Sequence, residues 1–178
     1  EKNFRYHSSS AMINIRNAKY VLLDGLVIRG GMSNAIHVEK SSHIRIANCD
    51  ISGWGRAGVQ RFDLNGRFYP AAGKFPKSFN GFNYDAAIYL KNSDNLLVER
   101  NYIHDPLGRA NSWTYAHPAG PEAVMVHVVR NTVIRYNDFI GSDAHRFNDA
   151  VEGWGNFHPR GGFNQDAEIY GNFMIFCN

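Results

Sequence analysis

Residues 44–51, Ile-Arg-Ile-Ala-Asn-Cys-Asp-Ile, carry the pattern that decides the fold, because similar strings recur along the chain of 178 residues. Residues 96–103 (LLVERNYI), 132–139 (TVIRYNDF) and 168–174 (EIYGNFM) follow the same frame. In the first two strings apolar residues stand two apart (Ile44 and Ile46, Leu96 and Val98), and in all four an apolar residue returns after a polar turn. A period of two is typical of one face of a β-strand, so the strings predict short strands separated by turns.

An apolar triplet precedes most of these strings and predicts a further strand in each repeat. Written inward–outward–inward, the triplets are residues 13–15, 36–38, 59–61, 88–90, 124–126 and 151–153. Arg61 and Gly153 break the third position, which is apolar in the others. A constant offset of 8 residues links the two strands: Ile15 to Leu23, Val38 to Ile46, Leu90 to Val98 and Val126 to Ile134.

Strands this short are not stable alone, but stacking one winding of chain on the next pairs each strand with the windings above and below it. We therefore predict an all-β parallel β-helix, a solenoid of about five to six coils that forms a single domain over residues 1–178. An antiparallel sandwich also has short strands, but it gives no reason for the constant offset. Long loops are expected near residues 62–86, 104–121, 141–149 and 154–165.

A further column follows three residues after the second strand. It contains Leu26, Cys49, Asn101, Asn137 and Asn172. Inward asparagines in such a column can bond the backbone of the neighbouring coil and stack as a ladder.

With this repeat, most of the chain resembles right-handed parallel β-helix proteins of the pectate-lyase-like kind. The resemblance is one of fold, and no catalytic signature points to a particular family. It implies carbohydrate-active chemistry, including elimination on uronate polymers as in pectate-lyase-like and alginate-lyase-like β-helices.

Composition narrows the function classes. Hydrophobic residues make up 44% of the chain, which predicts a folded core, and a net charge of +3 without a run of Lys or Arg argues against nucleic acid. No stretch is long enough to span a membrane. Cys49 and Cys177 are expected to be free thiols. We expect a piece of a longer secreted, periplasmic or cell-surface solenoid, with its oligomeric state open.

The predicted loops all lead into or out of the first strand, so its outward residues should form the floor of a groove. One outward column contains Asn14, His37, Gln60, Tyr89, Met125 and Glu152, and the next contains Arg16, Glu39, Phe62, Lys91, His127 and Trp154. Coils lie about 4.8 Å apart, so one sugar unit spans roughly one coil. The residues expected to bind sugar are His37, Tyr89, Lys91, His127, Arg146 and Trp154.

The densest group of acids and bases lies in residues 143–152, DAHRFNDAVE. A glycoside hydrolase needs two carboxyl groups at the scissile bond, and the candidates are Glu152, Asp149 and Asp143. His145 or Arg146 would adjust their protonation. Asp149 and Glu152 lie at most about 10 Å apart along the chain, with side chains expected to differ in direction. For Asp143 and Asp149 the structural alternative is capping of a turn.

Three functions remain open at this stage. The leading hypothesis is a glycoside hydrolase that acts on a polysaccharide or oligosaccharide and requires no cofactor. The second is a polysaccharide lyase, with Ca²⁺ as a candidate cofactor and with Tyr89, Lys91, His127 or Arg109 as the source of the base. The third is a non-catalytic solenoid for carbohydrate binding or adhesion.

Overall fold

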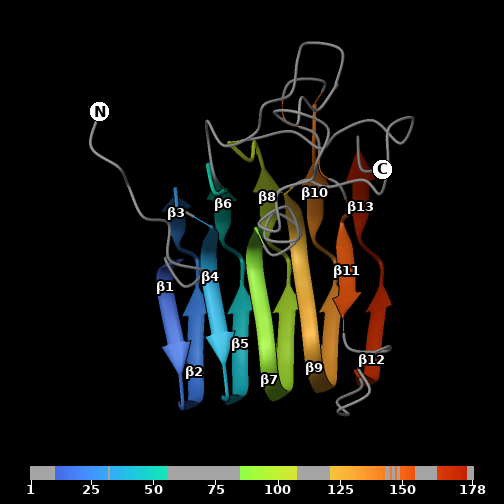
Figure 1. Ribbon diagram of the computed structural model, residues 1–178. Helices are drawn as coiled ribbons and strands as arrows, with labels where there is room; N and C mark the ends of the chain where they lie inside the picture. Colours follow the sequence, from blue (N-terminus) through green and yellow to red (C-terminus); the bar gives the residue numbers. More distant parts are fainter. Residues whose placement is uncertain are drawn as a thin grey trace, which may run out of the picture.

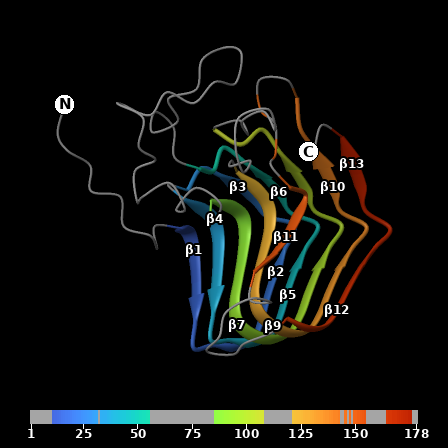
Figure 2. The same cartoon turned by 45° about the vertical axis from the view of Figure 1, so that its right-hand side comes forward.

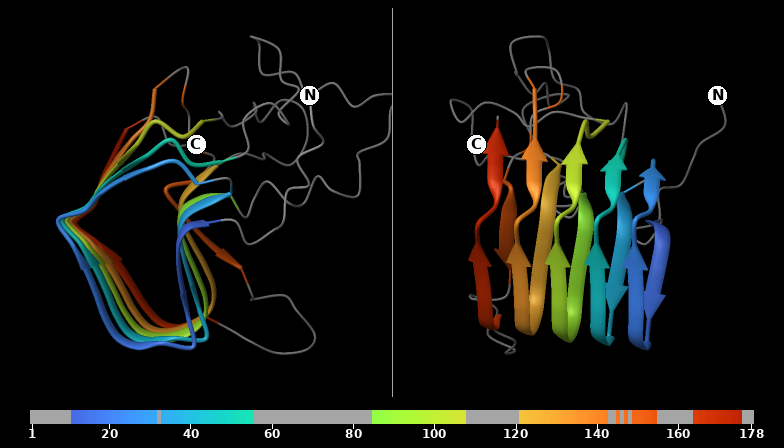
Figure 3. Two further views of the ribbon diagram at one scale, coloured as in Figure 1. Left: turned by 90° about the vertical axis from the view of Figure 1, so that its left-hand side faces the viewer. Right: turned by 180° about the vertical axis from the view of Figure 1, so that it is seen from behind.

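The protein is described from a computed structural model. The described residues are 11–31, 33–55, 85–107, 121–142, 145, 147, 149–154 and 164–175. They contain thirteen β-strands and no helix, and every pairing between the strands is parallel. The successive windings stack in register, as the view along the stack shows (Figure 3, left). The fold is therefore the predicted parallel β-helix. The described part contains no helix of the length and hydropathy needed to cross a membrane.

Each coil has three sides, which we call the first, second and third faces (Figures 1 and 2). The first face consists of β1 (Ala11–Arg16), β4 (Asn34–Glu39), the first parts of β7 (Ala86–Glu99) and β9 (Glu122–Arg135), and β11 (Val151–Trp154). The second face consists of β2 (Lys19–Asp24), β5 (Ser42–Ala47), the second parts of β7 and β9, and β12 (Gln165–Tyr170). The third face consists of β3 (Val27–Arg29), β6 (Asp50–Ser52), β8 (Tyr102–His104), β10 (Asp138–Ile140) and β13 (Phe173–Ile175).

These strands make five coils, within the predicted five to six. The constant offset of 8 residues is confirmed, because Leu23, Ile46, Val98 and Ile134 pair in sequence across the second face. Ile169 of β12 pairs with Ile134 and continues the same column. The single-domain prediction over residues 1–178 extends beyond the described residues and stays a prediction.

The predicted coil at residues 59–61 is wrong. Strand β4 pairs directly with β7, with Ile36 opposite Ile88, so no winding lies between them. The physical reason is that the predicted coil would have turned Arg61 inward, where a charged residue would lie unpaired in the core. Gln60 and Phe62, placed in the outward columns by the same prediction, lie outside the described residues, and their places are taken by direct pairs His37–Tyr89 and Glu39–Lys91.

The strands extend into the predicted loop ranges at several boundaries. Strand β7 begins at Ala86, β8 ends at His104, β11 ends at Trp154, and β12 begins at Gln165. Most of the predicted loop residues themselves, including 62–84 and 108–120, are outside the described part of the chain.

The core runs along the axis of the solenoid. Its members are the inward residues of all three faces, such as Ile36, Ile88 and Val124 of the first face, each 0% exposed. Burying apolar side chains of this size stabilises each by about 1.5–3 kcal/mol, so the core is the main source of stability. The short strands are therefore stable only as a stack.

The asparagine ladder is confirmed. The Oδ1 atom of Asn101 accepts from the Cys49 amide at 3.0 Å, that of Asn137 accepts from the Asn101 amide at 3.0 Å, and that of Asn172 accepts from the Asn137 amide at 2.9 Å. Each side-chain amide also donates to a carbonyl of the preceding coil, as from Asn137 to Val98 at 3.1 Å. The ladder holds the coils in register at the corner between the second and third faces.

Candidate functional site

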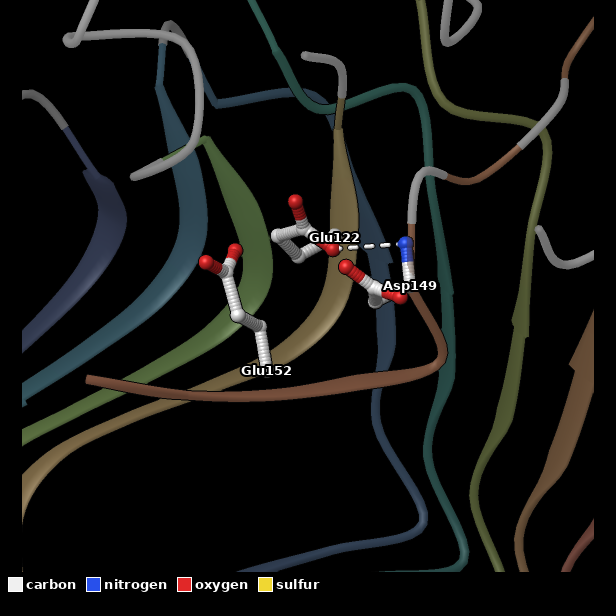
Figure 4. Close-up of side chains that lie close together, drawn as sticks. All are labelled: Glu122, Asp149 and Glu152. Atoms are coloured by element: carbon white, nitrogen blue, oxygen red, sulfur yellow. Dashed lines mark hydrogen bonds between the residues drawn. The ribbon is translucent and has the colours of Figure 1, made fainter. Parts of the chain in front are cut away.

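Three carboxylates gather on the first face, at the start of its last two strands. Glu122 begins β9, Asp149 lies two residues before the start of β11, and Glu152 lies in β11. One carboxylate oxygen of each residue lies within 4.8 Å of the other two (Figure 4). Glu122 is 0% exposed, whereas Asp149 and Glu152 are partly exposed. We call these residues the carboxylate cluster.

A break in strand alternation brings the cluster together. In four of the five coils two consecutive residues, such as Ala123 and Val124 in β9, lie in the core or pack against it. The residues on either side therefore face away from it. In the preceding coil Ala86, which pairs with Glu122, joins a separate buried group with Tyr89 and Met125. Glu122 and Asp149, each two residues before an apolar core position, thus come to the same side as Glu152.

Glu122 has a structural contact within the cluster. Its Oε2 atom accepts a hydrogen bond of 2.7 Å from the backbone amide of Asp149 (Figure 4). A hydrogen bond from an N–H group to a carboxylate is shorter and stronger than one between neutral groups. Glu122 therefore holds the backbone of the segment that carries Asp149 and leads into Glu152.

Next to the cluster, a row of rings crosses the first face. His37 and Tyr89 stack with their centroids 4.9 Å apart, and Tyr89 Oη lies 3.1 Å from Nδ1 of His127. Tyr89 pairs with Met125, which in turn pairs with Glu152, so the row and the cluster share one column of the sheet. The row thus places aromatic rings and polar atoms beside the carboxylates, with His37 and Tyr89 only 4% and 5% exposed.

His37 is buried, with 4% of its surface exposed, and neither ring nitrogen has a hydrogen-bond partner among the described residues. Burial is the largest influence on its pKa and lowers it, with Lys91 and Arg16 acting in the same direction against Glu39. We therefore expect a neutral imidazole at neutral pH.

The second outward column carries charge. Glu39 lies between Arg16, at 2.8 Å, and Lys91, at 3.5 Å. Although burial alone would raise the pKa of Glu39, the two cations outweigh it and hold that pKa below its usual value. Lys91 is therefore paired on this face, and its position beside His127 follows from the strand register.

Both outward columns are confirmed in register, apart from Gln60 and Phe62. Neighbouring strands pair within each column in the predicted order. The first column runs Asn14, His37, Tyr89, Met125, Glu152, and the second runs Arg16, Glu39, Lys91, His127, Trp154. Of Trp154 the structure describes the backbone alone. The predicted divergence of the Asp149 and Glu152 side chains is wrong, because both carboxylates belong to the cluster.

The remaining predicted site residues are not in the cluster. Asp143, Arg146 and Arg109 lie outside the described residues. His145 is described, and its Nδ1 lies 2.7 Å from the carbonyl oxygen of Pro106, which follows β8. This contact holds the His145 ring against the backbone that follows β8.

Glu122 was not among the predicted site residues. The signal that would have found it is a recurring triplet, an amide or acid followed by alanine and a β-branched apolar residue. The triplet occurs as Asn34-Ala35-Ile36, Glu122-Ala123-Val124 and Asp149-Ala150-Val151. Alignment of the coils on this triplet places Glu122 next to Asp149.

Comparison with protein families identifies the type of repeat. A family model described as a right-handed β-helix region matches residues 11–148. No protein in the curated collection matches the chain. The matching type of domain is shared by pectate lyases, glycoside hydrolases and other proteins. Since the match covers more than half of the 178 residues and the strands form the corresponding stack, the chain belongs to the right-handed β-helix family.

Proposed function

We propose that the protein hydrolyses glycosidic bonds of a polysaccharide or oligosaccharide at the carboxylate cluster. The observation that carries the proposal is the approach of Asp149 and Glu152 within 4.8 Å on an outward face, with both side chains partly exposed. Two carboxyl groups at one bond are the minimum machinery for this reaction. The buried Glu122 serves as a positioning residue.

The short separation favours the retaining form of the reaction. Retaining enzymes hold their two carboxyl groups about 5–5.5 Å apart, whereas inverting enzymes keep them about 6.5–9.5 Å apart to admit a water molecule. One carboxyl group of the pair protonates the leaving oxygen while the other attacks the anomeric carbon. Water then cleaves the glycosyl–enzyme bond, and the first group accepts the proton of that water.

The proposed reaction requires one carboxyl group of the pair to be protonated, as the general acid, while the other is ionised. His37, Tyr89, Lys91, His127, Arg146 and Trp154 are the proposed sugar-binding residues. A polysaccharide substrate also favours a secreted, periplasmic or cell-surface location.

The test compares Asp149→Asn and Glu152→Gln with the exposed acid Glu168→Gln of β12 as a matched control. Release of reducing ends should fall at least about 100-fold in the first two variants and by less than twofold in the control. A substrate with an activated leaving group should restore part of the activity of the variant that lacks the proton donor, but not of the variant that lacks the nucleophile. Full activity of both variants would rule the pair out.

A polysaccharide lyase is the second candidate, because Tyr89 and His127 form a pair able to accept a proton beside the same cluster. Calcium takes carboxylate oxygens at about 2.3–2.6 Å, so three oxygens within 4.8 Å of one another fit a shared Ca²⁺. Such an ion would neutralise the carboxylate of a uronate. Unsaturated sugar absorbance, lost on chelation, would favour the lyase. Binding without either product would favour an adhesion solenoid.

A further inference from the structure

A second polar cluster lies on the second face, around one buried carboxylate. Glu99 ends β7, with its side chain 2% exposed, and it pairs with Arg135 of β9. The cluster consists of Arg45, Glu99, Arg100, Arg135, Tyr136 and Tyr170, and we call it the arginine–tyrosine cluster. Its members come from four successive coils.

Two arginines contact both carboxylate oxygens of Glu99. Arg45 contacts its Oε1 at 2.7 Å, and Arg135 donates to its Oε2 from Nε at 2.8 Å and through a second nitrogen at 2.8 Å. Burial alone would raise the pKa of Glu99, but the hydrogen bonds from Arg135 and Arg45 outweigh it and hold that pKa below its usual value. The carboxylate is therefore ionised and saturated at neutral pH.

Within the cluster itself positive charge is in excess, and the exposed acids Asp24 and Glu168 lie at its edges on the same outward side of the second face. Arg100 lies 3.7 Å from the same carboxylate, so three guanidinium groups share one negative charge. The side chains of Arg45, Arg100 and Arg135 are 45%, 56% and 32% exposed. A guanidinium has five N–H donors, so these partly exposed arginines carry more donors than their contacts with Glu99 and the bond from Arg135 to Tyr170 use. By contrast, Arg29 on the third face is matched by one carboxylate, Asp50, at 2.8 and 2.6 Å.

Two tyrosines complete the cluster. Tyr170 Oη accepts a hydrogen bond of 3.1 Å from Arg135, whose guanidinium also lies 5.7 Å from the centre of the Tyr136 ring. The tyrosine rings meet edge to face at 5.7 Å. Tyr136 and Tyr170 are 49% and 40% exposed, although each is held in place by these contacts. The two exposed rings are therefore held in a fixed position beside guanidinium groups, an arrangement that can bind a ligand without first being reordered.

We propose that the arginine–tyrosine cluster binds an acidic polysaccharide, at a site separate from the carboxylate cluster. Guanidinium groups bind carboxylate or sulfate groups in a planar two-bond geometry, and tyrosine rings pack against sugar rings. Coils follow one another at about 4.8 Å, so charged groups on consecutive sugars meet arginines of consecutive coils. A nucleic acid fits less well, because the patch has a net charge of about +2 and most nucleic-acid sites use more phosphate contacts.

Binding of the whole chain to four probes tests the site: polygalacturonate, dextran sulfate, neutral dextran and a single-stranded oligonucleotide. Binding of polygalacturonate or dextran sulfate, weakened by salt, supports the proposal, and their ratio identifies carboxylate or sulfate as the preferred group. Failure of both to bind, or equally tight binding of dextran or of the oligonucleotide, would overturn it.

Variants assign the binding to the cluster. Arg45→Gln combined with Arg100→Gln should weaken binding at least about tenfold, and it leaves Arg135 on Glu99 to preserve the fold. Lys19→Gln combined with Lys40→Asn removes the same charge from exposed positions elsewhere and should change affinity less than twofold. Tyr136→Ala should weaken binding severalfold without altering charge.

Equal losses in the two double variants, or an unaffected Tyr136→Ala, would mean that binding depends on overall charge alone and would contradict the proposal. The site is independent of the proposed hydrolysis. Glu152→Gln should retain binding at the arginine–tyrosine cluster, so failure of one proposal leaves the other testable.

Discussion

Asn137→Ala should be strongly destabilising, because Asn137 lies in the middle of the asparagine ladder and is 0% exposed. Its Oδ1 accepts from the Asn101 amide at 3.0 Å, and its Nδ2 donates to the Val98 carbonyl at 3.1 Å. Truncation removes the partners of two buried backbone groups, each of which costs about 1–3 kcal/mol. The expected loss is therefore about 2–6 kcal/mol. The substitution also removes the side-chain bonds from Asn137 to Asn101 Nδ2 and Asn172 Oδ1. These losses are not counted, because Asn101 Nδ2 still donates to the Ile46 carbonyl and Asn172 Oδ1 still accepts from the backbone amide of residue 137.

Urea unfolding followed by far-ultraviolet circular dichroism measures this loss as a lower midpoint at an unchanged slope. Asn14→Ala is the matched control, since Asn14 is an exposed asparagine on the first face, away from the ladder. The control should lie within about 0.5 kcal/mol of the parent. If Asn137→Ala costs less than about 1 kcal/mol, the ladder is not a source of stability and the reasoning fails.

Three further predictions concern the other contacts that hold the coils together. Cys49→Asn should raise the urea unfolding midpoint, because Cys49 occupies the ladder position of its coil and a side-chain amide there adds hydrogen bonds to the neighbouring coils. A lower midpoint would contradict the ladder geometry. Trp54→Ala should cost about 3–5 kcal/mol, since Trp54 is 0% exposed and stacks on Phe147 at 5.8 Å, while the exposed Tyr20→Ala should cost far less in the same urea assay. A hydrogen bond from Arg29, aided by His104, lowers the pKa of Asp50 to about 2, so its stabilising effect is complete above about pH 4 and is lost as the pH falls through 2. The stability difference between the parent and Asp50→Asn should shrink over that interval, and a constant difference would show that the ionised carboxylate is not responsible.

The stack was predictable from the sequence because its signals are local and repeated. Ile46, Val98 and Ile134 each stand eight residues after an inward position of the first strand, and all three pair across the second face. The ladder asparagines Asn101 and Asn137 were predictable for the same reason. A corner that recurs with identical chemistry in successive coils requires no knowledge of distant contacts.

The pairing of one coil with the next was harder to predict, because the segments between successive coils differ in length. Residues 59–61 offered one apolar inward residue, Val59, and were assigned to a coil on spacing alone. Ile36 instead pairs directly with Ile88, which lies 52 residues later in the chain, so no coil separates β4 from β7. Spacing predicts a coil reliably where both inward positions of the triplet are apolar. The charged residue Arg61 at the second of these positions indicated that residues 59–61 do not form a coil.

The carboxylate cluster was missed in part because a period of two does not hold at the entrance to each first-face strand. With strict alternation, residues three apart, such as Asp149 and Glu152, would lie on opposite sides of the sheet. Ala150, next to Val151, is instead buried, and the same doubling occurs at Ala123-Val124. A small alanine allows two neighbours to face the core, which turns the residues before and after the pair to the same side. The alanine is therefore what makes a sequence separation of three compatible with a shared site, and it explains why Glu122, two residues before Val124, also belongs to it.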